Sequence, residues 1–159
     1  AEVYRGGGFN SLVWYDLAML DSFLEAATAL VLGGDVVAWR VLGREHFERD
    51  LGSLFGTATG RAGDPAQVLK RSVTTWPRLY DFATARIVEP PGNAGTTRAL
   101  VRFDGFDAAS LALRNATIGI TEGLVMKSIP AGEIATRVLT GEASFVRDFE
   151  FELAWPAPR

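Results

Sequence analysis

The sequence predicts an α+β fold, in which a four-stranded antiparallel sheet built from two hairpins carries a long helix. Two pairs of strand-like segments, with one long helical pattern between them in the chain, support this prediction. The last segment gives a third observation, because its apolar and polar residues alternate. We expect these elements at residues 83–89, 96–103, 110–128, 134–139 and 144–155, with N-terminal helices packed against them.

The chain is expected to form one domain. Its 159 residues suit a single hydrophobic core, and no repeat, low-complexity tract or linker divides them. We therefore assign residues 1–159 to one domain, of which residues 1–13 form an irregular arm. A first helix is predicted over residues 16–32, where apolar residues recur at three- and four-residue spacing, and Gly33-Gly34 marks its end.

Two further helices are predicted before the first strand. The second covers residues 35–55, and within it Gly43 would allow a neighbouring backbone to approach closely. The third begins at Asp64-Pro65-Ala66-Gln67, where aspartate can cap the helix, proline suits the first helical position and glutamine completes a capping box. We expect this helix to end near Trp76-Pro77, because proline interrupts helical hydrogen bonding.

The long helix contains two glycines that need an explanation. Gly119 and Gly123 lie one turn apart, and each glycine costs about 1 kcal/mol relative to alanine in a helix interior. The pair therefore predicts close packing against another backbone or a flat surface. Glu122 lies between these glycines among apolar neighbours, and we expect either an exposed position or a salt bridge in preference to catalysis.

Alternation gives the last strand two different faces. Asp148, Glu150 and Glu152 share one face, which we expect to be solvated. Arg147 is the exception on the other face, and we expect it at the rim with its charge turned toward water. The core-facing set is predicted to be Phe145, Arg147, Phe149, Phe151, Leu153 and Trp155.

Composition excludes several classes of function. Acidic residues outnumber basic ones by 19 to 16, so no basic patch supports nucleic-acid binding. The chain has no cysteine, which removes disulfides, thiol nucleophiles and cysteine-based metal sites. Since histidine occurs once, we expect no metal and no cofactor. No apolar run is long enough for a membrane span and no signal peptide is visible, so a cytoplasmic location is expected.

Few residues in the sequence suggest catalysis. His46 is the single histidine and lies in a charged helical segment, where it is either a surface residue or a contact at the mouth of a ligand site. No Gly-x-Ser-x-Gly motif accompanies it. Carboxylate-based chemistry therefore remains the third hypothesis, behind ligand binding and structural interaction.

Aromatic residues from separate segments are expected to converge between the helices and the sheet. This convergence indicates either an ordinary core or a pocket for an apolar ligand, in which tryptophan and tyrosine supply polar groups at the ends of large apolar side chains. The candidate ligand-binding residues are Trp39, His46, Phe47, Trp76, Tyr80, Phe106 and Met126.

Local patterns accompany this order of elements. Trp14-Tyr15 precedes the first helix, and Val41-Leu42-Gly43-Arg44-Glu45 lies in the second. Gly119-Ile120-Thr121-Glu122-Gly123 precedes the closing hairpin of residues 135–155. Together with the segment 65–88, these patterns resemble the ligand-binding superfamily shared by TRAPP subunits, 4-vinyl-reductase-type sensor domains and haem nitric-oxide-binding proteins. The resemblance covers residues 12–155.

The chain also departs from these families. The zinc-binding cysteines of the 4-vinyl-reductase-type sensors are absent, and His46 lies too early in the chain to match the haem-binding histidine. The resemblance therefore implies a member without zinc and without haem. It also implies a scaffold that pairs with itself or with related subunits, and that encloses an apolar cavity.

The leading hypothesis is a non-enzymatic regulatory or sensory domain that binds a small apolar ligand, a protein partner, or both, through a dimeric scaffold. The alternative is a purely structural protein–protein interaction module with a filled core. A homodimer is expected to use the first helix, because apolar residues such as Met19 and Phe23 extend beyond one stripe of it.

Overall fold

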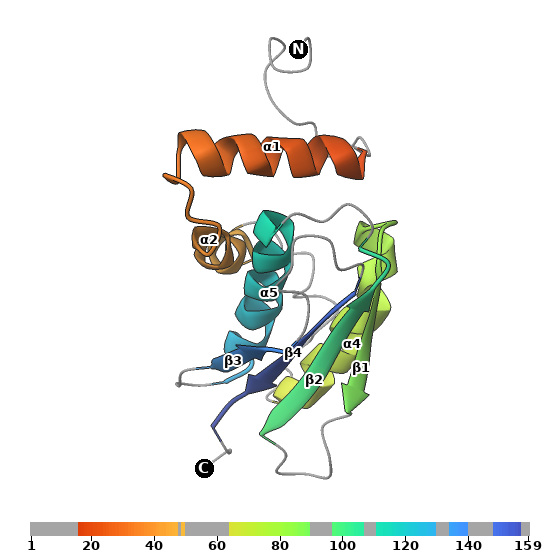
Figure 1. The fold of residues 1–159 in the computed structure, drawn as a ribbon. Coiled ribbons are helices and arrows are strands. Elements are labelled where there is room, and N and C mark those ends of the chain that lie inside the picture. The colour runs from red at the N-terminus through yellow and green to blue at the C-terminus, as the bar shows by residue number, and fades with distance from the viewer. Residues whose placement is uncertain are drawn as a thin grey trace.

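The computed structural model confirms the α+β prediction (Figure 1). Its helices and strands are α1 (Leu17–Leu30), α2 (Ala38–His46), α4 (Pro65–Leu79), β1 (Thr84–Glu89), β2 (Arg98–Asp104), α5 (Leu111–Met126), β3 (Ala135–Val138) and β4 (Phe149–Ala154). The structure describes residues 16–47, 49, 64–89, 97–106, 111–129, 134–139 and 148–156. The predicted arm, the later part of the second helix, Phe145 and Arg147 lie outside these residues.

The two hairpins form one antiparallel sheet with the strand order β1-β2-β4-β3. β2 and β4 pair at its centre, where Val101 lies opposite Phe151 and Phe103 lies opposite Phe149. This register places the apolar residues of both strands on one face, as alternation predicts. Phe103 and Phe149 stack with ring centroids 5.1 Å apart, and both are buried.

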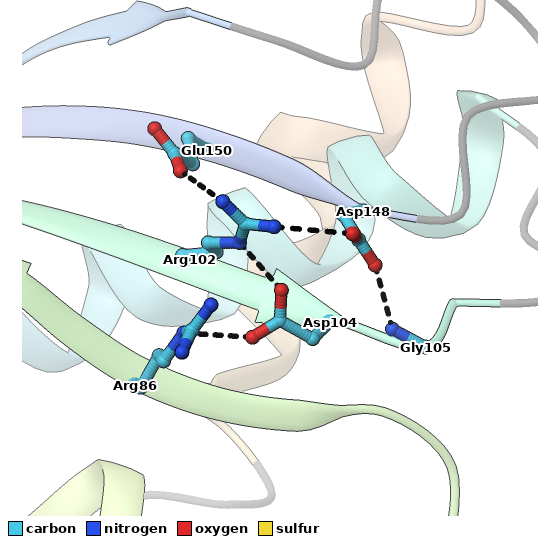
Figure 2. Close-up of polar contacts among 6 residues, drawn as sticks. All are labelled: Arg86, Arg102, Asp104, Gly105, Asp148 and Glu150. Atoms are coloured by element: carbon cyan, nitrogen blue, oxygen red, sulfur yellow. Dashed lines mark hydrogen bonds and ion pairs between the residues drawn. The ribbon is translucent and has the colours of Figure 1, made fainter.

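The opposite face of the sheet is charged. Arg102 on β2 donates hydrogen bonds to Asp104, Glu150 and Asp148, while Arg86 pairs with Asp104 at 2.7 Å (Figure 2). The hydrogen bonds to Asp104 and Glu150 raise the pKa of Arg102. The acidic face predicted to be solvated is therefore only partly exposed, and its carboxylates pair with arginines across the strands.

The helix of residues 65–79 begins as expected but continues past the expected end. The Asp64 carboxylate accepts a hydrogen bond from the Ala66 amide at 2.9 Å, and Pro65 is the first helical residue. Pro77, expected to end the helix, lies inside it. Proline lacks only its own N–H donor, so the Tyr80 amide still bonds to the Trp76 carbonyl at 3.0 Å and closes the last turn.

The helices α2 and α5 pack backbone against backbone, as their glycines predict (Figure 1). A Cβ atom on Gly43 would overlap the carbonyl oxygen of Ala116, and one on Gly119 would overlap the carbonyl oxygen of Arg40. The third glycine, Gly123, faces the side chain of Phe47, with 3.1 Å between the position of an added Cβ and that ring. The crossing of the two helices therefore depends on Gly43 and Gly119 more than on Gly123.

We expect Gly119→Ala to lower the free energy of unfolding by about 2–3 kcal/mol, because the added methyl group would displace a backbone that has no room to move. The matched control is Gly123→Ala, whose methyl group would lie 3.1 Å from the Phe47 side chain and 3.3 Å from the Arg44 carbonyl oxygen, so that shifts of a few tenths of an ångström suffice. There, the gain in helix propensity should hold the change below about 1 kcal/mol. Equal losses for the two variants in urea denaturation would contradict this explanation of the crossing.

Candidate functional site

A cavity of about 390 Å³ lies among the four helices. None of the described residues that line it lies in a strand, whereas the sequence predicted a pocket between the helices and the sheet. The difference arises because the space above the sheet is filled by apolar side chains of the strands, such as Phe103 and Phe149. The lining residues are Leu20, Leu24, Trp39, Leu42, Gly43, Glu45, His46, Arg49, Trp76, Tyr80, Phe82, Leu113, Ala116, Thr117 and Ile120.

Aromatic rings form one wall of the cavity. Trp76 contacts the ring of Tyr80 at a centroid distance of 4.2 Å and the ring of Phe82 at 6.0 Å. On its other side Trp76 packs edge-on against Phe103 of the sheet, at 4.8 Å. The sheet therefore supports this wall from behind, which makes it a fixed surface against which a flat or apolar molecule could pack.

The polar groups of both tryptophans are occupied within the protein. The Trp76 indole donates to the Phe82 carbonyl at 3.2 Å, and the Trp39 indole donates to the Thr28 hydroxyl at 2.7 Å. Thr117 likewise donates to the carbonyl of Leu113 in its own helix, at 2.9 Å. Because these polar groups are already hydrogen-bonded within the protein, the interior of the cavity is more apolar than the sequence alone suggested.

Tyr80 carries the remaining polar group of the aromatic wall. None of the described residues exchanges a hydrogen bond with its hydroxyl. Burial raises the pKa of the Tyr80 phenol above its usual value, so the group stays neutral at physiological pH. A neutral hydroxyl can either donate to a ligand or accept from it.

The charged lining residues belong to α2 and its continuation. Glu45, His46 and Arg49 line the cavity and are exposed to solvent. Their spacing explains the arrangement, because Trp39, Leu42, His46 and Arg49 recur every three or four residues and share one side of a helix. Glu45, His46 and Arg49 form a charged rim at the exposed end of this side. Trp39 and Leu42, at the other end, border the apolar interior.

Four of the seven candidate residues line this cavity, namely Trp39, His46, Trp76 and Tyr80. Phe47 lies on another side of α2, about 100° from His46, and packs with Val68 and Leu124. Phe106 contacts Phe82 and Phe149, at 5.3 and 4.9 Å, and belongs to the core above the sheet. Met126 lies near the end of α5 and is not among the lining residues.

The sequence reasoning missed the aliphatic part of the lining. Leu113, Ala116, Thr117 and Ile120 share one side of α5, and their three- and four-residue spacing was visible in the sequence. That signal shows which residues share a surface, but it does not show whether the surface packs tightly or borders a cavity. Leu20 and Leu24 of α1 were missed for the same reason.

Glu122 occupies the other side of the crossing between α2 and α5. Its carboxylate accepts hydrogen bonds from the Arg40 guanidinium and from the Thr136 hydroxyl on β3, and Arg44 approaches it at 3.6 Å. The side chain is 2% exposed, so the salt bridge proposed as one of two alternatives is present and buried. Glu122 thus joins α2, α5 and β3 and does not reach the cavity.

Neither a metal centre nor a membrane span is found within the described ranges. No three histidine, cysteine or acidic side chains gather there in a way that could hold a metal ion. No helix in the same residues has the length and apolar character needed to cross a membrane. In comparisons with known proteins, no family model matches the chain and no curated protein is similar to it in sequence.

Proposed function

We propose that this protein is a non-enzymatic regulatory or sensory domain, which binds a small apolar molecule in the cavity among α1, α2, α4 and α5. The observation that carries the proposal is the cavity itself. About 390 Å³ of space is bordered by tryptophan, tyrosine, phenylalanine and leucine side chains. Binding sites for small molecules combine this apolar character with a small number of polar groups, here the Tyr80 hydroxyl and the rim residues.

The distribution of carboxylates supports binding over catalysis. Glu45 is the one acidic residue among the described lining residues, and it is exposed at the rim. Glu122, the buried carboxylate, is held by Arg40 and Thr136 away from the cavity. General acid–base chemistry with paired carboxylates needs two such groups facing one substrate, and the described cavity offers one.

The order of elements supports the further proposal that the chain is a distant relative of the TRAPP and 4-vinyl-reductase-type superfamily, without its zinc or haem. The confirmed sheet, with the long helix between its two hairpins, is compatible with that kinship. The absence of cysteine supports a role in a reducing compartment such as the cytoplasm.

A second candidate function, pairing with another copy of the chain or a related subunit, is favoured by one exposed surface. Five of the seven large hydrophobic residues that are exposed in the described part of the chain come from positions 30–42. Apolar side chains gathered in this way commonly mark interaction sites. Leu42 also lines the cavity, so we give the name corner surface to the other four, which are Leu30, Val31, Val37 and Val41. Phe23, a candidate contact in the sequence, instead packs partly buried against the core.

The ligand proposal predicts that filling the cavity abolishes binding. Ala116→Leu should weaken binding of the fluorescent apolar probe N-phenyl-1-naphthylamine by at least about tenfold, because the larger side chain occupies the space that the probe needs. The matched control is Ala135→Leu, an exposed position on β3 outside the lining. Fluorescence titration measures both variants. A filled core, as the interaction-module alternative requires, would leave the probe unbound by the unmodified protein.

The pairing proposal predicts that a charge on the corner surface dissociates a dimer. The unmodified protein should sediment as a dimer at about 10–50 μM, and Val31→Asp should sediment as a monomer with unchanged circular dichroism, because Val31 is 77% exposed. Leu139→Asp, at an exposed apolar residue outside this surface, serves as the control and should stay dimeric. A monomeric unmodified protein would exclude the homodimer.

A further inference from the structure

The helix α1 contacts the other described elements less than α2, α4 or α5 does. It buries two of its 14 residues, Leu24 and Thr28, whereas α5 buries 11 of its 16. In Figure 1, α1 lies above α2 and α5. Moving α1 would uncover Leu17, Leu20, Phe23 and Leu24, which is a smaller loss of burial than separating α5 would cause.

The connection between α1 and α2 contains two exposed glycines in the left-handed conformation. Gly33 and Gly34 have φ angles of 61° and 87°, a conformation that other residues rarely adopt. A Cβ atom on either glycine would meet no atom within 4 Å, so packing does not require glycine here. The two residues are exposed, and rotation at them would break only the hydrogen bonds that the Gly34 and Asp35 amides donate to the carbonyls of Thr28 and Leu32, at 2.9 and 3.0 Å.

The helix α2, by contrast, is fixed. Gly43 and Gly119 hold its backbone against α5, and the buried pair of Arg40 with Glu122 holds it from the other side. Shifting α2 would expose the Glu122 carboxylate and break its hydrogen bonds with Arg40. This costs far more free energy than moving α1. Of these two helices, α1 is therefore the one that can open the cavity.

Among the described side chains, a hydrogen bond joins α1 to α2. The Trp39 indole of α2 donates to the Thr28 hydroxyl of α1 at 2.7 Å, and that hydroxyl in turn donates to the Leu24 carbonyl at 2.6 Å. Thr28 is buried but does not line the cavity. Asp21 of α1 adds a charge attraction to the buried Arg114 of α5.

We propose that α1 is a lid over the cavity, which swings at Gly33-Gly34 and is latched by the hydrogen bond from Trp39 to Thr28. The proposal rests on the ligand-binding function, because the lid controls exchange of the ligand at that same site. Opening moves Leu20 and Leu24 away from the cavity, while the aromatic wall, supported by the sheet, stays in place.

Removing the latch should speed both opening of the lid and exchange of the probe. Thr28→Val keeps the shape of the side chain and removes the hydroxyl, and Trp39→Phe keeps a ring and removes the indole donor. Each variant should raise hydrogen–deuterium exchange of the α1 amides by about two- to tenfold, the range that one hydrogen bond accounts for. The amides of α5 should be unchanged in both variants.

Stopped-flow fluorescence with N-phenyl-1-naphthylamine should show faster association and faster dissociation by a similar factor. The matched control is Trp76→Phe, which removes another indole donor from the cavity wall. The Trp76 indole bonds to the Phe82 carbonyl and not to α1. Hydrogen–deuterium exchange of the α1 amides should therefore be unchanged in this variant. The double variant of Thr28 and Trp39 should resemble either single variant, because both remove the same hydrogen bond.

The outcomes separate the lid from the ligand-binding function. If α1 exchanges as slowly as α5 in the unmodified protein, or if neither latch variant changes its exchange, the lid is excluded. If the unmodified protein does not bind the probe, the ligand proposal fails for this class of molecule. Hydrogen–deuterium exchange of the α1 amides then decides whether α1 opens. If Thr28→Val does not fold, Trp39→Phe gives the decisive measurement.

Discussion

The contact between the backbones of α2 and α5 is the constraint on which the rest of the helical layer depends. Two glycines make it possible, because a methyl group at either Gly43 or Gly119 would overlap a carbonyl oxygen of the facing helix. Helices that approach this closely cannot slide past one another without separating. The crossing therefore fixes the orientation of α2, and that orientation decides which side chains face the cavity and which face Glu122.

The two sides of α2 have different chemistry as a result. On one side Arg40 and Arg44 approach the buried carboxylate of Glu122, which would be costly to bury without them. On the other side Trp39, Leu42 and His46 face the cavity. The charged side holds the helix in place, and the apolar side can border a cavity because the crossing, together with the ion pair, already supplies the attachment. Structural and binding roles are thus divided between opposite sides of one short helix.

Much of the fold was predictable because it depends on local signals. Alternation in residues 149–154 predicted which face of the sheet packs in the core. The glycines Gly119 and Gly123 predicted a close helix contact. The end of α4 was not predictable from Pro77, because a proline in the last turn removes only one donor. The position of the cavity was not predictable either, since it depends on how far apart packed helices lie. Residue types show that Phe47 is apolar, but not that the crossing turns it toward Gly123.

The candidate site, too, was predictable only in part. Trp76 and Tyr80 were recognisable as large side chains with polar ends, and the structure places both in the cavity wall. Their hydrogen bonds were beyond sequence reasoning, although these decide which polar groups remain available to a ligand. Both indoles are satisfied internally, while no described residue bonds to the Tyr80 hydroxyl. The weak attachment of α1 could likewise be seen only after its burial was known.

The most direct test of the central claim, that the crossing holds an apolar cavity open among four helices, is a crystal structure determined under xenon pressure. Xenon enters dry apolar cavities and is readily located by its electron density. We expect at least one xenon atom between Trp39 and Trp76, with α2 and α5 in unchanged contact at Gly43 and Gly119. Side chains that fill this space, with no xenon among the four helices, would contradict the claim.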